Sequence, residues 1–220
     1  MKKIKVIIFD AYGTLFDVNS AAEKCKEKIG DKWESFANYW RTTQLEYTWL
    51  RSLMKRHKDF WQVTEDSLDK SLLAFKIDPN MRSELLNLYK ILNTFPEVKD
   101  VLKNLKEKKY KISILSNGTP DLLDRLVKSN DLEKMFDDIF SIEEVGIYKP
   151  DEKVYDMPIK KYKVEKNEVA FLSANTWDVS GAGNFGLNAI WVNRNKNIFD
   201  KLDYIPHNEI NNLNRLLKLI

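Results

Sequence analysis

The stretch VIIFDAYGTL, residues 6–15, decides the fold of this 220-residue chain. Its four apolar residues run directly into Asp10, and a Gly-Thr pair begins three positions after that carboxylate. A short continuous apolar run is typical of a strand buried on both faces of a parallel sheet. In such sheets ligands gather at the carboxyl ends of the strands. The stretch therefore predicts a central strand that delivers Asp10 to a site, with Tyr12 where a second acid would make a metal site.

Four more apolar runs predict further strands of the same kind. They lie at residues 111–116, 137–141, 168–173 and 188–193. Helical patterns separate them, at residues 97–108, 119–129 and 151–162. Because strands alternate with helices, we expect an α/β fold built on a doubly wound parallel sheet.

Residues 17–92 break this alternation, since they contain no convincing strand. Helical patterns take its place, at residues 31–56, 59–77 and 80–92. Four tryptophans fall in this region: Trp33, Trp40, Trp49 and Trp61. Aromatic helices of this kind form a core or, alternatively, a dimer face. We expect a core domain of residues 1–16 and 93–220, and an all-helical cap domain of residues 17–92 inserted after the first strand.

The composition is that of a soluble globular protein, with 31% charged and 43% apolar residues. A net charge of +3 is too small to indicate binding to nucleic acid. Cys25 is the only cysteine, which excludes an intrachain disulfide. Lys5 and Asp10 keep the first apolar run too short for a signal peptide, and no stretch approaches the roughly 20 residues of a membrane span. We expect a cytoplasmic protein with no nucleic-acid or membrane partner.

Polar side chains follow each predicted strand, where the carboxyl ends of a parallel sheet meet. Thr14 is placed to hold one oxygen of Asp10 while the other faces a cavity, which is the arrangement of a nucleophile. The polar residues after the later strands are Ser116, Asn117, Lys149, Tyr155, Ser173, Asn175 and Asp178. An ordinary capping role is the alternative for Asp10 and for residues 173–178.

Two basic residues suit an anionic substrate. Lys149 lies in a loop after a strand, where a buried cation would keep nearby carboxylates ionised; a surface lysine is the alternative. Arg41 is expected on a helix, with an apolar stripe beside it. That stripe consists of Ala37, Leu45 and Trp49. Arg41 would therefore face the sheet edge and take an anion; the alternatives are that it extends its charged end to solvent or pairs with Glu34 or Glu46.

Several common catalytic patterns are absent from the sequence. His57 and His207 stand beside no Ser, Cys or Asp in a catalytic pattern, so we expect both to be solvated and exclude a Ser-His-Asp hydrolase. Neither GxGxxG nor a Walker loop occurs, so nothing indicates nucleotide binding.

Taken together, these segments resemble the haloacid dehalogenase superfamily. FDAYGTL, LSNG, YKP and SANTWD look like its four motifs, in order and at strand ends, and the match spans nearly the whole chain. Most members are Mg²⁺-dependent phosphatases with a second Asp where this chain has Tyr12, and with more acids in the fourth motif. In these departures, and in RTTQLEYTWLRSLM of the cap, the chain is similar to the L-2-haloacid dehalogenases. The resemblance implies a Rossmann-like core.

The resemblance also implies a mechanism without metal or cofactor. Asp10 would attack C2 of a short-chain L-2-haloalkanoic acid, expel halide and form an ester, which water would hydrolyse to a D-2-hydroxy acid. Catalysis would use Asp10, Thr14, Arg41, Lys149, Ser173, Asn175 and Asp178. Substrate and halide would contact Ala11, Tyr12, Arg41, Leu45, Phe60, Ser116, Asn117, Tyr155 and Trp177. A homodimer is expected by resemblance and from the aromatic cap.

Within these sets the expected roles differ. Lys149 would keep Asp10 ionised, with Ser173 and Tyr155 steadying that network. Water would be positioned by Asn175 and Asp178, and the halide would be held by Arg41, Asn117 and Trp177. The substrate carboxylate would bind Ser116 and the amides near Ala11 and Tyr12, and the apolar pocket would consist of Tyr12, Leu45, Phe60 and Trp177. Two alternatives stay open: a Mg²⁺-dependent phosphatase or phosphonatase of the same fold, and a non-catalytic binding protein.

Overall fold

A parallel sheet forms the centre of the protein, seen in a computed structural model that describes residues 4–206 and 208–220. The expectation for His207 lies outside the described residues. The strands are β1 (Val6–Phe9), β2 (Lys111–Ser116), β3 (Asp138–Ser141), β4 (Val169–Ser173), β5 (Asn188–Val192) and β6 (Asn208–Ile210). Their order is β3-β2-β1-β4-β5-β6, and every pairing is parallel. The predicted doubly wound sheet is confirmed; the short edge strand β6 was not predicted.

Strand β1 lies in the middle of the sheet and is buried along its whole length. Phe9, its last residue, pairs with Ile114 on β2 and with Leu172 on β4. Because all three strands run in the same direction, the residues after them meet at one edge. Asp10 follows β1 there, so the strand order itself brings the predicted polar residues together.

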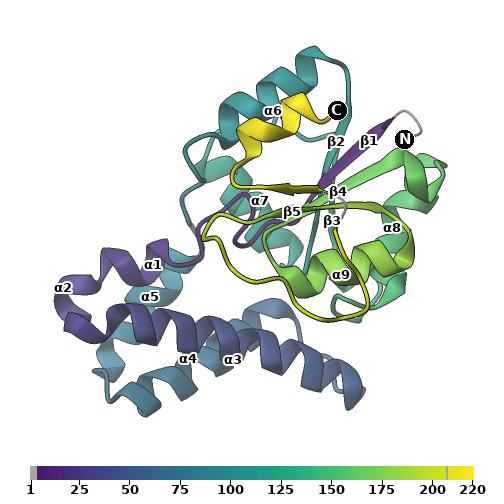
Figure 1. Ribbon diagram of the computed structural model, residues 1–220. Coiled ribbons are helices and arrows are strands. Elements are labelled where there is room, and N and C mark those ends of the chain that lie inside the picture. Colours follow the sequence, from purple (N-terminus) through teal and green to yellow (C-terminus); the bar gives the residue numbers. More distant parts are fainter. Residues whose placement is uncertain (1–3, 207) are drawn as a thin grey trace.

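Helices cover both faces of this sheet. They are α6 (Val98–Glu107), α7 (Pro120–Ser129), α8 (Glu152–Tyr162) and α9 (Thr176–Phe185), with the short 3₁₀ helices η3 (Ile142–Glu144), η4 (Lys166–Glu168) and η5 (Leu213–Lys218). Figure 1 shows α6 and η5 on one side of the sheet and α8 and α9 on the other. Helix α6 buries Val98, Val101, Leu102 and Leu105, the spacing of a helix with one apolar face. Within the described residues, no helix is long and apolar enough for a membrane span.

A second layer of helices forms the cap beside the sheet (Figure 1). It contains α1 (Ser20–Lys24), α2 (Lys26–Ile29), η1 (Gly30–Lys32), α3 (Trp33–Leu53), α4 (Phe60–Phe75), η2 (Pro79–Met81) and α5 (Arg82–Tyr89). The three predicted helical patterns are confirmed with shorter bounds, whereas α1 and α2 were not predicted. Trp40 is buried against the other cap helices, so this tryptophan belongs to the core and to no dimer face.

The chain enters and leaves the cap through two segments that lie side by side. The amide of Asp17 donates to the carbonyl of Asn93 at 2.8 Å, and the amide of Phe95 donates to the carbonyl of Leu15 at 3.0 Å. These contacts lie next to the expected domain boundaries. The division into residues 1–16 with 93–220 and residues 17–92 stays a prediction.

At its far end the cap contacts the core a second time, and we call this the tip contact. His57 Nε2 lies 2.9 Å from Glu143 Oε2, and the Tyr148 hydroxyl donates to the carbonyl of Lys58 at 2.6 Å. The amide of Tyr148 donates to Ser52 Oγ at 3.3 Å. The expectation that His57 is solvated was wrong, because its ring is half-buried between Glu143 and Tyr148.

Candidate active site

Asp10 lies at the carboxyl end of β1, is only 5% exposed, and has its two oxygens held differently. Oδ2 accepts three hydrogen bonds, from Thr14 Oγ1 at 2.9 Å, Asn175 Nδ2 at 2.9 Å and Ser173 Oγ at 3.3 Å. Oδ1 accepts one, from Lys149 Nζ at 3.1 Å. Since Oδ2 is fully engaged and Oδ1 is not, Oδ1 is the oxygen with lone pairs left for chemistry.

Lys149 joins Asp10 to a second buried carboxylate. Its Nζ lies 2.9 Å from Asp178 Oδ2, and the lysine side chain is 1% exposed. Burial alone would lower the pKa of Lys149, but the carboxylates of Asp10 and Asp178 outweigh it and raise that pKa. Lys149 is therefore a cation at neutral pH, and the alternative of a surface lysine is wrong.

Asp178 is fully buried in the first turn of α9. Burial raises its pKa to about 6, since desolvation and the charge of Asp10 outweigh the Lys149 ammonium. The hydroxyl of Tyr155 donates to Asp178 Oδ1 at 2.7 Å. Because that hydroxyl is used inside the protein, we interpret Tyr155 as a positioning residue for Asp178, where the sequence had suggested a substrate contact.

The loop that carries Thr14 is fixed by residues that the sequence analysis missed. Arg194 donates from Nη2 to the carbonyl of Thr14 at 2.8 Å and from Nη1 to Glu97 Oε1 at 2.6 Å. Although burial would raise the pKa of Glu97, its bonds to Arg194 lower it. These partners are 80 or more residues from Thr14 in sequence, and no local motif marks them.

Several donors surround the space beside Asp10. Asn117 Oδ1 accepts from the amide of Lys149 at 3.2 Å, so the Asn117 amide group is left to donate. Ser116 Oγ accepts from the amide of Gly118 at 3.1 Å and keeps its own hydrogen. The amides of Ala11 and Tyr12 have no acceptor among the described residues. These predicted residues therefore lie together, with free donors suited to an anion.

Arg41 reaches this space from the cap. It is half-buried on α3, and its Nη1 donates to Gln44 Oε1 at 2.8 Å. The buried Gln44 is held in turn by Thr64 Oγ1 at 2.7 Å and the Tyr89 hydroxyl at 3.0 Å. In the described part of the chain Arg41 has no carboxylate partner, so the predicted alternative of pairing with Glu34 or Glu46 was wrong. Gln44 was not predicted; its only signal is its place one turn from Arg41.

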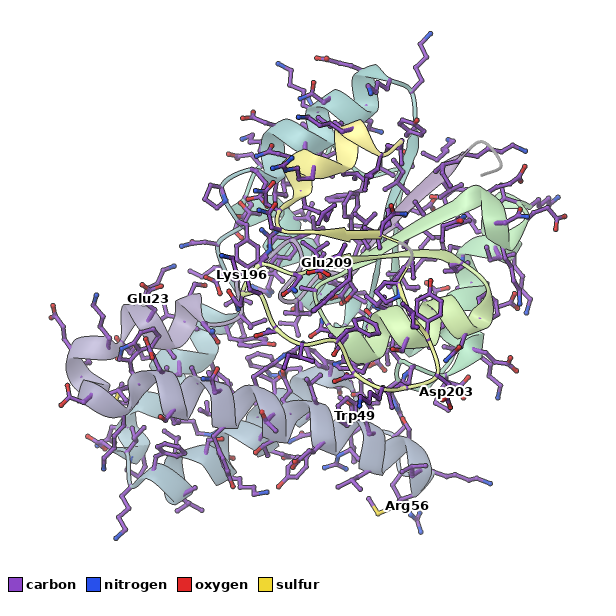
Figure 2. The ribbon with its side chains drawn as sticks, viewed as in Figure 1. Glu23, Trp49, Arg56, Lys196, Asp203 and Glu209 are labelled. Atoms are coloured by element: carbon purple, nitrogen blue, oxygen red, sulfur yellow. The ribbon has the colours of Figure 1, made fainter. Side chains whose placement is uncertain are left out.

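Apolar side chains complete the surroundings. The ring of Tyr12 lies 5.1 Å from that of the buried Phe60, measured between centroids. Trp177 meets Trp49 edge to face at 5.4 Å, and Figure 2 shows Trp49 where α3 faces the core. Leu45 is half-buried on the same helix. Phe60 and Tyr12 thus form an inner wall, whereas Trp177 and Leu45 are less deeply buried.

A cleft of about 480 Å³ reaches the site between the cap and the core. Its lining includes Arg41 from the cap and Asn175, which donates to Asp10. Figure 2 shows Glu23 on the cap side and Lys196 on the core side of this region. Polar side chains dominate the lining, so the cleft suits water and small anions.

Comparison with known proteins agrees with this geometry. Residues 4–186 match the family model of the haloacid dehalogenase-like hydrolases. The chain belongs to this family. The sequence-based assignment to these hydrolases, and within them to the L-2-haloacid dehalogenases, is confirmed.

Relatives of this haloacid dehalogenase-like hydrolase match over their full lengths. It is 40% identical to the (S)-2-haloacid dehalogenase of Pseudomonas sp. (strain YL), covering 100% of this chain and 95% of the relative. A dehalogenase crystal structure superposes with a TM-score of 0.97 at 35% identity, covering 100% and 98% of the two chains. The L-2-haloacid dehalogenase of Xanthobacter autotrophicus, solved with chloropropionic acid covalently bound, has a TM-score of 0.91 at 32% identity, covering 98% of each chain.

Proposed function

We propose that the protein is an (S)-2-haloacid dehalogenase, which hydrolyses short-chain L-2-haloalkanoic acids to D-2-hydroxy acids. The observation that carries this proposal is the asymmetry of Asp10, whose Oδ2 accepts three hydrogen bonds while Oδ1 accepts one. A carboxylate fixed through one oxygen presents the other as a nucleophile. The covalent chloropropionic acid adduct of the Xanthobacter relative supports the same chemistry.

In the first step Asp10 Oδ1 attacks C2 on the side opposite the halogen. A bond from Oδ1 to C2 forms, the carbon–halogen bond breaks, and the halide leaves with the electron pair, so the configuration at C2 inverts. The free donors of Arg41 and Asn117 stabilise the developing negative charge. Halide is a weak base that needs no proton, which is consistent with Tyr12 in place of a second acid.

In the second step water attacks the carbonyl carbon of the Asp10 ester. The ester carbonyl oxygen is Oδ2, which already accepts from Thr14, Ser173 and Asn175. These three donors stabilise the negative charge that forms on Oδ2 in the tetrahedral intermediate. The bond between the carbonyl carbon and Oδ1 then breaks, and the released alkoxide takes up a proton from the attacking water.

The groups that serve this water lie on α9 and just before it. Both amide hydrogens of Asn175 are used, toward Asp10 and the carbonyl of Tyr12, so its Oδ1 is left to accept from water. Asp178 supplies a carboxylate close to Asp10, joined to it through Lys149. We assign Asn175 to water orientation and Asp178 to proton uptake.

The donor set does not fit a magnesium ion. Mg²⁺ takes an octahedral set of oxygens, usually with one or two carboxylates and substrate phosphates. Here the Lys149 ammonium already lies between the carboxylates of Asp10 and Asp178 and pairs with both. The phenol of Tyr12 offers no carboxylate. We derive no step through a metal.

Halide release from L-2-chloropropanoate in the presence of EDTA tests this proposal directly. We expect turnover by the wild type and none by Asp10→Ala, with p-nitrophenyl phosphate and Mg²⁺ assayed in parallel. Phosphatase activity without halide release would overturn the proposal and favour the phosphatase alternative. In a single turnover in heavy-oxygen water, the label should enter Asp10 because water attacks the enzyme carbonyl.

We also propose that the protein is a cytoplasmic homodimer. Three apolar side chains near the end of α3 are exposed: Leu50 by 50%, Leu53 by 79% and Met54 by 61%. Exposed apolar side chains that gather within five residues of one helix end favour association with a partner. Sedimentation equilibrium should give twice the chain mass, and Leu53→Glu should shift it toward the monomer; a monomeric wild type would contradict the proposal.

A further inference from the structure

The hydroxyl of Tyr12 is a buried polar atom without a hydrogen-bond partner among the described residues. Buried hydroxyl groups in folded proteins nearly always have a partner, so each exception calls for an explanation. Tyr12 immediately follows Asp10 and Ala11 at the end of β1, and its ring forms the inner wall of the proposed site. An apolar wall alone would be served equally well by phenylalanine.

Neighbouring residues hold the Tyr12 ring in one place. It stacks on Tyr89 at 5.7 Å with an interplanar angle of 17°, and it packs against Phe60 at 5.1 Å. On a third side it lies against Gly118, where an added Cβ would come within 2.9 Å of Tyr12 Cε2 and 3.0 Å of its hydroxyl. Because the ring is held on three sides, the hydroxyl stays beside Gly118.

This position places the hydroxyl beside the proposed halide contacts. Gly118, which it abuts, directly follows Asn117, whose amide group is left to donate. Burial raises the pKa of Tyr12 well above 10, and the charges of Arg41 and Asp10 also act on it. The phenol therefore stays protonated, as a buried hydrogen-bond donor near the Arg41 guanidinium and the Asp10 carboxylate.

We propose that the Tyr12 hydroxyl donates a hydrogen bond to the departing halogen, alongside Arg41 and Asn117. This inference rests on the proposed dehalogenase function. As Oδ1 of Asp10 bonds to C2, the halogen leaves with the electron pair of the carbon–halogen bond and becomes an anion. The phenol keeps its proton throughout, so no proton is transferred. Tyr12 is then a catalytic residue whose oxygen acts in the first step, in addition to the role of its ring.

The test compares Tyr12→Phe with the wild type on L-2-chloropropanoate and L-2-bromopropanoate. Loss of one hydrogen bond to a charged atom should lower kcat for the chloro acid roughly 10- to 100-fold. Bromide is the better leaving group and the weaker hydrogen-bond acceptor, so Tyr12→Phe should lower kcat for the bromo acid several-fold less than for the chloro acid. The ratio of chloride to bromide release should therefore decrease, and a merely structural role would leave it unchanged. Thermal melting checks that the variant is folded.

Two further variants sharpen this result. Gly118→Ala displaces the Tyr12 ring without removing the hydroxyl and should shift the ratio in the same direction. Tyr39→Phe removes a hydroxyl on the outer part of α3 and should change neither rate. An unchanged ratio of chloride to bromide release in Tyr12→Phe overturns the inference. A variant with a raised KM, an unchanged kcat and weaker inhibition by propanoate also overturns it, because the hydroxyl would then bind the substrate carboxylate. A wild type that releases no halide from either acid overturns the proposed function, and this inference with it.

Discussion

Replacing Lys149 with methionine tests the charge balance of the site. The lysine side chain is 1% exposed and lies 3.1 Å from Asp10 and 2.9 Å from Asp178, whose side chains alone are 7% and 0% exposed. Methionine fills much of the same volume but leaves two buried carboxylates without their shared cation. Removing one partner of a buried ion pair costs about 3–5 kcal/mol. For a protein of this size, that corresponds to a decrease in Tm of roughly 6–20 °C.

The loss should depend on pH in a definite direction. Without Lys149, the pKa of Asp178 should rise above its value of about 6 in the wild type, because the ammonium is what lowers it. A carboxyl whose pKa is raised in the folded protein destabilises the fold increasingly as the pH rises from its unfolded pKa of about 4 to its folded pKa, above which the loss is constant. The Tm deficit should therefore be full at pH 8 and smaller at pH 5, because it shrinks as the pH falls from the raised pKa toward about 4.

Thermal melting of both proteins at pH 5 and pH 8 measures this effect, and single-turnover halide release measures the chemistry. We expect halide release to slow by about 10³-fold or more, because Asp10 loses the cation that holds its Oδ1 beside the substrate. Lys160→Met is the matched control, since Lys160 is 79% exposed and pairs with Asp156 on the surface at 2.7 Å. Such exposed pairs contribute little to stability. Equal Tm deficits at both pH values would refute the charge argument and indicate lost packing.

Three further outcomes are expected. Asp10→Ala should retain its fold and lose halide release by about 10⁴-fold or more, because the nucleophile is absent. Halide titration measures this, and a loss of only about 10-fold would show that Asp10 is not the nucleophile. In the pH–rate profile, the wild-type kcat should fall below about pH 6 as Asp178 takes up a proton. Tyr155→Phe should move this acidic limb to higher pH, because the Asp178 carboxylate loses a hydrogen-bond donor. An acidic limb that does not move would belong to another group. Gln44→Ala should raise KM and lower kcat together, with a roughly 10-fold decrease in kcat/KM, because Arg41 loses the acceptor that orients it. Steady-state kinetics on L-2-chloropropanoate measure this, and unchanged kcat and KM would show that Arg41 is oriented without Gln44.

Much of the fold follows from the sequence because its signals are local. The run of residues 6–9 and its later counterparts are apolar without interruption, which distinguishes buried parallel strands from half-exposed ones. Because neighbouring parallel strands end at the same edge of the sheet, the polar residues that follow them must lie close together. For this reason Asp10 and Asp178 could be placed together from the sequence. Strand β6 carries no such run, since Asn208–Ile210 holds one buried apolar residue at the sheet edge.

Other parts of the site depend on contacts between distant segments, and the sequence carries no mark of them. The bonds from Gln44 to Thr64 and Tyr89 join three cap helices, so they require the packing of those helices. Lys149 contacts both Asp10 and Asp178, and the spacing of these residues in the sequence does not define the distances between their side chains. His57 was expected to be solvated, and it is half-buried because Glu143 and Tyr148 approach it from the core.

The tip contact bears on how substrate can reach the buried Asp10. Tyr148, which is bonded to Ser52 and Lys58 of the cap, immediately precedes Lys149. Swinging the cap open at that end would drag the lysine away from Asp10. The crossing segments around residues 17 and 93 are also hydrogen-bonded to each other, so the cap is held to the core at both of its ends. With both ends held, we expect substrate to reach Asp10 through the cleft of about 480 Å³ past Arg41 and Asn175, whose mostly polar lining favours small charged acids over bulky apolar ones.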